Sequence, residues 1–413
     1  MRNRIGLGVF VVCAPENTLR GFPLAIFLLT TLIFSIMGLI KRPNELTVKT
    51  TLSALIYGQP GMGKAQPLYC NILTPTGFKK LSDLSVGDEV MGHDGKVQKV
   101  LGIYPQGIRP VYRIMTNDSA ITYCDEEHIW TVRSSTGNSR KAGFKNVTLK
   151  EMIAKGISCP LSPSRQSTTR KAIPRYEIPV AEAMDYPEKE YEVNPYILGV
   201  LIGDGSLTGN VAMFSNPDMD NQILEEVKML LPSVYSIRKN EAPQCPQYSI
   251  VLRGNGEGYI QKIKRLGLNV HSGDKFIPSE YKLGSREQRL ALLRGLMDTD
   301  GHANKNRVSF STSSRILADD FVHLVLSLGG IAKAVGYPRE DKGIEYRVTV
   351  NMSECPFTLE RKAAQWKPVT PSRYIIDAEK IEDSECVCIK VSNEDELYIT
   401  CLLYTSDAAD EGL

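Results

Sequence analysis

Ile197-Leu-Gly-Val-Leu-Ile-Gly-Asp204-Gly205 is one of two similar segments that decide the fold in the middle of this chain. The second segment, Leu293-Arg-Gly-Leu-Met-Asp-Thr-Asp300-Gly301, ends in the same Asp-Gly pair 96 residues later (300 − 204). In a helix, Gly199 or Gly295 would let a partner backbone come close, as small residues do at tight helix crossings. We therefore expect two pseudo-symmetric repeats whose helices pair and bring two carboxylates together at their ends.

Asp204 and Asp300 would then form a close pair of acids. Such a pair is unfavourable unless a divalent cation lies between the charges, so these two residues are natural Mg²⁺ ligands. A metal held there would polarise a scissile phosphate and generate the attacking hydroxide. Basic and polar residues alternate along 248–253 and 307–315, which would place them on sheet faces that fit a DNA groove. Helices are expected at 219–231 and 315–328, behind those sheets.

A nucleotide-binding loop is interrupted near the start of the chain. Gly58-Gln-Pro-Gly-Met-Gly63-Lys64 follows an apolar run at 52–57, so it has the glycines, the lysine and the context of a P-loop. The next residue is Ala65, where a P-loop needs Ser or Thr to ligate Mg²⁺. The chain then enters turn residues at 74–77 instead of a helix. We interpret Gly58, Gly63 and Lys64 as the remnant of a nucleotide site into which a foreign segment has been inserted.

The residues that follow this junction have a β pattern and a family resemblance. From Ala65 to about Arg133, short alternating apolar stretches are broken by Gly, Asp and Pro, which predicts strands and hairpins. Residues 65–78 followed by 84–96 resemble the N-terminal block of an intein, a protein insert that excises itself and ligates its flanks. The resemblance implies a Hint splicing domain. Residues 37–46 resemble the start of a phage-type P-loop ATPase, which would be the host.

The candidate splicing residues resemble a less common intein class. That class has a non-nucleophilic first residue, a His-x-Trp motif and a late cysteine that attacks the upstream bond, which match Ala65, His128 with Trp130, and Cys388. The resemblance implies that Cys388 attacks the Lys64 carbonyl carbon and expels the Ala65 amine. A thiolate is a strong nucleophile, and an imidazole such as His128 can protonate the amine near neutral pH. Trp130 would pack over the nucleophile and exclude water.

Three neighbouring assignments stay open. Cys386 would face the same way as Cys388 on a strand, and only the register of the block favours Cys388. Cys70 is expected to be a buried strand residue rather than a nucleophile. Asp125 stands where the family usually has Thr, which leaves the polarisation of the scissile amide undecided.

The two paired segments also resemble the signatures of LAGLIDADG (DOD-type) homing endonucleases. The resemblance implies cleavage of double-stranded DNA with Mg²⁺ held by Asp204 and Asp300. Lys275 resembles a lysine block between the signatures and could orient water or stabilise the leaving oxygen. The alternative for Lys275 is a solvated surface lysine.

The predicted fold class is an all-β Hint splicing domain interrupted by an α+β two-repeat LAGLIDADG endonuclease domain. We expect an N-terminal extension at 1–36, a host fragment at 37–64 and the first splicing part at 65–165. The endonuclease is expected at 176–360, the second splicing part at 368–400 and a non-native tail at 401–413. Residues 160–175 are expected to be the linker into the endonuclease. We expect the last splice residues to be missing, so that this chain neither hydrolyses ATP nor completes splicing.

Composition excludes several classes. Lys plus Arg number 49 against 47 Asp plus Glu, so DNA contacts must come from local patches. Nine Cys without CxxC pairs argue against a disulfide framework and a zinc site, and fit a reducing, cytoplasmic compartment. Residues 21–40 are uncharged and long enough to span a bilayer, but we expect a mis-assigned start of translation instead.

We expect a monomer whose partners are DNA and the host extein in cis. Two alternatives stay open: a free-standing LAGLIDADG DNA endonuclease with an inactive β domain, and a membrane-anchored P-loop ATPase.

Overall fold

The computed structural model describes residues 54–56, 65–135, 143–167, 172–240, 245–304, 307–340, 343–394 and 396–401. The nucleotide-site remnant (Gly58, Gly63 and Lys64), the extension 1–36, the apolar segment 21–40 and residues 402–413 lie outside this described part. Among the described residues, no helix has the length and apolar character needed to cross a membrane.

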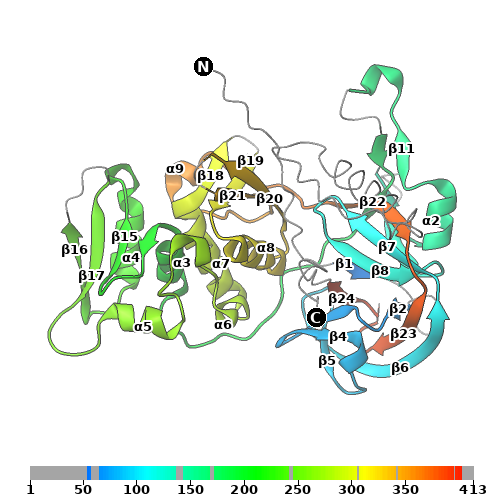
Figure 1. Ribbon diagram of the computed structural model, residues 1–413, viewed down its shortest axis with the longest axis horizontal. Helices are drawn as coiled ribbons and strands as arrows, with labels where there is room; N and C mark the ends of the chain where they lie inside the picture. Colours follow the sequence, from blue (N-terminus) through cyan, green and yellow to red (C-terminus); the bar gives the residue numbers. More distant parts are fainter. Residues whose placement is uncertain are drawn as a thin grey trace, which may run out of the picture. The chain divides into compact units, whose positions relative to one another are not determined.

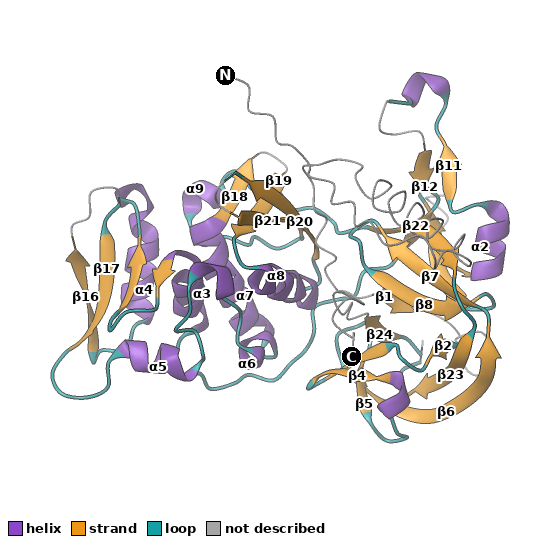
Figure 2. Ribbon diagram, in the orientation of Figure 1, coloured by secondary structure: helices purple, strands orange, loops and turns teal. Residues whose placement is uncertain are grey.

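The two ends of the described chain build three sheets together (Figures 1 and 2). Strands from the first end are β1 Ala54–Ile56, β2 Gln66–Pro67, β3 Asn71–Thr74, β4 Gly77–Lys80, β5 Glu89–Met91, β6 Val97–Arg109, β7 Val111–Thr116, β8 Ile121–Asp125, β9 Ile129–Ser134, β10 Lys145–Thr148 and β13 Tyr176–Ile178. Strands from the second end are β22 Arg373–Lys380, β23 Ser384–Val391 and β24 Tyr398–Cys401. The sheets have the orders β1-β24-β3-β4, β2-β23-β6-β5 and β10-β9-β13-β22-β7-β8, so each contains at least one strand from either end. Among the described residues of this β part, α2 Leu149–Lys155 is the one α-helix, and two short 3-10 helices, Leu81–Asp83 and Pro163–Arg165, accompany it.

The boundary predicted between the first splicing part and the endonuclease is wrong. Residues 160–175 are not a plain linker, because β11 Ser158–Pro160 pairs with β12 Ala172–Pro174. Strand β13 pairs with both β9 and β22, so the first splicing part extends to Ile178 rather than to residue 165. The Ser-, Thr- and Pro-rich residues stand between β11 and β12 in the sequence. The strand after it is held by burial, and Arg133 donates two hydrogen bonds to the buried Glu177 carboxylate at 2.9 and 2.6 Å.

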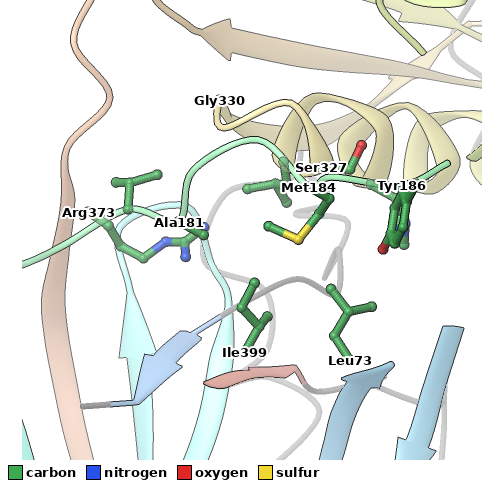
Figure 3. Close-up of a pocket in the computed structure, with 11 residues that line it drawn as sticks. Leu73, Ala181, Met184, Tyr186, Ser327, Gly330, Arg373 and Ile399 are labelled. Atoms are coloured by element: carbon green, nitrogen blue, oxygen red, sulfur yellow. The ribbon is translucent and has the colours of Figure 1, made fainter. Parts of the chain in front are cut away.

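A segment without helix or strand, residues 179–194, follows β13. In this segment, the side chains of Ala181, Met184 and Tyr186 are buried in one cluster with Leu73 and Ile399. Figure 3 shows Met184 extending from this segment toward those two residues, in a small, mainly apolar pocket. Most of its lining side chains are apolar, and the polar exceptions include His323 and Arg373.

The middle of the chain consists of two repeats with the same order of elements. The first contains α3 Pro195–Asp204, β14 Gly205–Ser206, β15 Ala212–Ser215, α4 Asn221–Leu230, β16 Tyr235–Asn240, β17 Gln247–Leu252 and α5 Tyr259–Arg265. After α6 Ser279–Lys282, the second contains α7 Arg286–Asp300, β18 Gly301–Asn304, β19 Arg307–Thr312, α8 Arg315–Ser327, β20 Ile331–Arg339, β21 Gly343–Asn351 and α9 Glu360–Ala363. The sheets have equivalent orders, β14-β15-β17-β16 and β18-β19-β21-β20. Helices α4 and α8 confirm the helices predicted at 219–231 and 315–328.

Helices α3 and α7 cross closely, as their glycines predict (Figure 1). A Cβ added to Gly199 would lie 2.4 Å from Leu292 O, and one added to Gly295 would lie 2.3 Å from Tyr196 O. Both obstacles are backbone atoms, which cannot move aside without separating the helices. Both repeats share one hydrophobic core, so the crossing lies at the centre of a single folded unit.

Candidate functional sites

Strand pairing brings the predicted nucleophile to the predicted junction. Strands β2 and β23 are antiparallel, with Gln66 opposite Val387 and Pro67 opposite Cys386. Continuing this register by one residue places Ala65 opposite Cys388. Neighbouring strands lie about 4.8 Å apart, so these two residues are adjacent across the sheet.

Both cysteines face the junction side of β23. Ala65, Cys386 and Cys388 are buried in one small cluster, whereas Val387 and Ile389 belong to another. The prediction that the two cysteines point the same way is therefore confirmed. The register separates them, because Cys386 is opposite Pro67, two residues further from the Lys64–Ala65 bond.

The residue after the junction is anchored by polar contacts. Gln66 is fully buried, accepts a hydrogen bond from Tyr398 Oη at 2.9 Å and donates one to Tyr123 O at 3.2 Å. These contacts tie β2 to strands β8 and β24 and thereby fix the position of Ala65. Sequence reasoning missed Gln66, although a polar residue at the start of a buried strand was an available signal.

His128 lies in the turn between β8 and β9 and is fully buried. Its backbone N–H donates to Asp125 O at 3.3 Å, and the Asp125 N–H donates to Ala65 O at 3.1 Å. This turn therefore joins the histidine segment directly to the first residue after the junction.

Trp130 occupies a different place from the one predicted. It is the second residue of β9, and its ring lies edge-on to His128 with centroids 5.6 Å apart. Its side chain belongs to the core cluster of Ile114, Cys124 and Met152, not to the cluster that holds Cys388. The expectation that it packs over the nucleophile is wrong, because alternation along β9 directs Trp130 into the core of the six-stranded sheet.

An Arg109–Asp125 ion pair lies beside the junction. Arg109 donates to Asp125 Oδ2 through Nε at 3.0 Å and Nη2 at 2.7 Å. Burial raises the pKa of Asp125, and the guanidinium opposes this shift. The second carboxylate oxygen, Oδ1, is buried and accepts no hydrogen bond within the described part of the chain. Arg109 gave no signal in the sequence, since its partner lies on another strand.

Burial disfavours the thiolate form of two cysteines near the junction. Burial raises the pKa of Cys386 to about 12, and the neighbouring Asp125 charge adds to the effect. Cys70 is fully buried, as predicted, and burial raises its pKa further above the ordinary value. A thiol with such a pKa is neutral near pH 7 and therefore behaves as an apolar packing group.

The second candidate site lies where α3 and α7 end. Asp204 and Asp300 are the last residues of these helices and line one cleft together with Lys275, Arg339 and Glu345. A Cβ added to Gly203, the residue before Asp204, would lie 3.4 Å from Asp300 Oδ2, which shows how closely the two chains approach. Burial, and then the charge of Asp204, raise the pKa of Asp300 to about 7. Burial likewise raises the pKa of Asp204.

This donor set fits a magnesium ion. Two adjacent carboxylates whose ionisation is penalised are stabilised by a bound divalent cation. Mg²⁺ is usually held by one or two carboxylates and keeps several waters. Within the described residues, no group of three or more His, Cys, Asp and Glu side chains gathers, so a ligand-rich cage is not the arrangement found here.

Lys275 is buried rather than solvated, so that alternative is wrong. Its Nζ donates to the carbonyls of Ile202, Gly203 and Gly205 at 2.7, 2.9 and 2.9 Å, at the carboxyl end of α3. Only 4% of the residue is exposed, and burial lowers its pKa while the charges of Asp300 and Asp204 oppose this. All three ammonium protons are thus used by the helix end, and Lys275 supplies a fixed positive charge near the acids.

Lys362 is the equivalent residue of the second repeat. Its Nζ donates to Met297 O, Asp298 O and Thr299 O at 3.0, 2.7 and 3.0 Å, at the carboxyl end of α7. Sequence reasoning missed it. The spacing hid the equivalence, because Lys275 lies 71 residues after Asp204 (275 − 204), whereas Lys362 lies 62 after Asp300 (362 − 300).

Comparisons with known proteins found one matching family model and several similar proteins. Residues 287–356, which include most of the second repeat, match the family model of the LAGLIDADG-like domain. The chain is 28% identical over 371 residues to the replicative DNA helicase DnaB of Mycobacterium intracellulare, an alignment that covers 84% of this chain and 58% of the helicase. The chain thus spans little more than half of that relative.

Two solved structures each resemble part of the chain. The gp41-1 intein is 28% identical, with 22% of this chain and 62% of that chain covered and a TM-score of 0.18. I-DmoI in complex with DNA and Ca is 12% identical, with 41% and 94% covered and a TM-score of 0.30.

Proposed function

We propose that this chain is an intein carrying a homing endonuclease, inserted in the P-loop of a DnaB-like helicase. The interrupted loop at 58–64 and the similarity to a replicative helicase support the choice of host. The observation that best supports the splicing part is the β2–β23 pairing: its register, continued by one residue, would bring Cys388 from the far end of the chain opposite Ala65.

The proposed first step transfers the upstream segment to a thiol. Cys388 Sγ bonds to the Lys64 carbonyl carbon, and the bond between that carbon and the Ala65 nitrogen breaks. The products are a thioester on Cys388 and a free amine on Ala65. The proton lost by the thiol balances the proton gained by the amine, and His128 is the proposed carrier. The acyl group then passes to a downstream Ser or Thr, and a terminal Asn cyclises to release the insert.

The proposed endonuclease acts on double-stranded DNA. Asp204 and Asp300 would hold Mg²⁺, which when bound polarises a scissile phosphate and makes a water acidic. Lys275 and Lys362 hold positive charge behind the two acids and fix both helix ends. The two sheets contribute Arg and polar side chains for contacts to phosphates and bases. We propose a monomer, since one chain holds both repeats.

Thiol-induced cleavage tests the splicing part. A purified chain starting at Met37 is treated with dithiothreitol, and the release of residues 37–64 is followed by mass spectrometry. We expect release from the wild type and from Cys386→Ala, and none from Cys388→Ala. The opposite pattern would move the nucleophile to Cys386. Absence of release from the wild type would refute the proposal of splicing chemistry.

Cleavage of a plasmid tests the endonuclease part. The substrate carries the uninterrupted P-loop coding sequence of a DnaB-like helicase, and products are separated with Mg²⁺ or with EDTA. We expect linear DNA only with Mg²⁺, and none from Asp204→Asn or Asp300→Asn. Cleavage without any thiol-induced release would instead favour the free-standing endonuclease.

A further inference from the structure

We propose that each buried lysine of the endonuclease is positioned by the opposite repeat, so that each half of the cleavage site is completed by its partner half. This inference rests on the proposed endonuclease function. The proposed positioning residues are Ser314 and Asp320 for Lys275. For Lys362 they are Gln222 and Asp220.

The segment around Lys275 is held by the second repeat. Ser314 Oγ donates to Lys275 O at 2.6 Å, and Asp320 Oδ2 accepts a hydrogen bond from Ile277 N at 2.8 Å. Ser314 is fully buried and is also the N-cap of α8, where its Oγ accepts from Leu317 N at 3.1 Å. The start and first turns of α8 therefore fix the backbone at and just after Lys275, whose ammonium bonds the end of α3 in the first repeat.

The segment around Lys362 is held by the first repeat in the same way. Gln222, at the start of α4, accepts from Glu360 N at 2.9 Å and donates to Thr358 O at 3.1 Å. Arg361 Nη2 donates to Asp220 Oδ2 at 2.5 Å. These contacts hold the residues just before Lys362, whose ammonium bonds the end of α7 in the second repeat.

The two halves differ in one respect. Asp298, in the second repeat itself, accepts hydrogen bonds from Leu359 N at 3.0 Å and from Tyr196 Oη at 2.9 Å. The equivalent position of the first repeat is Ile202, which has no polar side chain. Lys362 therefore has support from both repeats, and the segment of Lys275 depends more on α8.

The arrangement predicts strand-selective defects. A lysine side chain has four rotatable bonds, so it keeps one buried position only if its backbone is fixed. The two repeats are related by pseudo-symmetry and the two DNA strands by a similar relation, so each lysine lies nearer one scissile phosphate. Loosening the Lys275 segment should slow one strand, and loosening the Lys362 segment should slow the other.

The experiment uses the full chain with Ser314→Ala and Gln222→Ala as matched variants. The substrate is the duplex with the uninterrupted P-loop sequence, with each strand end-labelled in turn. We expect each variant to slow one strand by about tenfold, the loss expected for one well-placed hydrogen bond, and to leave the other nearly unchanged. The two variants should accumulate nicks in opposite strands. Equal slowing of both strands by either variant would overturn the inference and leave the endonuclease function standing.

A second measurement does not depend on cleavage. Brief treatment with acetic anhydride, followed by mass spectrometry of peptides, reports which lysines become reachable. We expect Ser314→Ala to increase acetylation of Lys275 alone and Gln222→Ala that of Lys362 alone. Unchanged protection in both variants would overturn the inference, even if the wild type leaves the plasmid intact and the endonuclease function fails.

Controls separate positioning from general loss of stability. Thr148→Ala removes an N-cap of similar geometry from α2, far in sequence from either lysine, and Met229→Ala truncates an exposed side chain on α4. Neither should change strand preference or lysine acetylation. Asp320→Ala serves as the second variant if Ser314→Ala does not fold, since it removes the acceptor for Ile277 N and should give the same strand bias.

Discussion

Replacing Asp300 by Asn should stabilise the metal-free protein, and the gain should grow with pH. Burial and then the charge of Asp204 raise the pKa of Asp300 from 3.8 to about 7. Because the folded state binds this proton more tightly than the unfolded chain, the resulting stability is complete below pH 3.8 and is lost as pH rises through about 7. At about 1.4 kcal/mol per pKa unit, the wild type has lost about 2 kcal/mol of this stability near pH 5, where Asp300 ionises only in the unfolded chain. Near pH 8 the loss has reached about 4 kcal/mol.

Urea denaturation in EDTA at several pH values measures this difference. The gap between Asp300→Asn and the wild type should widen by about 2 to 3 kcal/mol from pH 5 to pH 8. Asp185→Asn, which removes an exposed carboxylate, should follow the wild type. Added Mg²⁺ should stabilise the wild type and not the Asp300 variant. A gap that stays constant with pH, or a variant that is less stable at pH 8, would refute the reasoning.

Two further predictions concern packing and charge. Gly295→Ala should destabilise the chain by about 2 to 3 kcal/mol, because its Cβ would lie 2.3 Å from the backbone oxygen of Tyr196. Gly209→Ala, whose Cβ has only one neighbour at 3.9 Å, should change the free energy of unfolding little in the same urea experiment; equal effects would contradict the close crossing. Arg373→Met should cost about 3 to 5 kcal/mol by chemical denaturation, because it leaves the Asp118 carboxylate, bonded at 2.9 and 2.7 Å, buried without its guanidinium. Adding Asp118→Leu should restore part of this loss, and a double variant as unstable as the sum of both single changes would count against a buried ion pair.

Local patterns were enough to predict several features of the two repeats and of the β part. Apolar periodicity predicted α4 and α8, and the glycines of the two repeated segments predicted the close crossing of α3 and α7. The period of two along β23 predicted that Cys386 and Cys388 share a face. These features depend on residues close together in sequence, where spacing alone determines which side chains share a face.

Contacts between distant segments could not be predicted in this way. The membership of β13 in the six-stranded sheet and the core position of Trp130 depend on which strands become neighbours. Lys362 was missed because its partners are carbonyls of a helix more than sixty residues away, and backbone atoms leave no mark in the sequence.

The sequence by itself determined the repeated helices, their terminal acids and the alternating strands around Ala65, because each follows from local periodicity and residue type. The tertiary structure alone decided that β23 pairs with β2 beside Ala65, that Asp125 pairs with Arg109, and that the segments carrying Lys275 and Lys362 accept and donate hydrogen bonds across the two repeats. The physical reason is that register and side-chain pairing arise only when the hydrophobic faces of separate segments pack together. Many pairings are compatible with the same local patterns, and burial selects one of them.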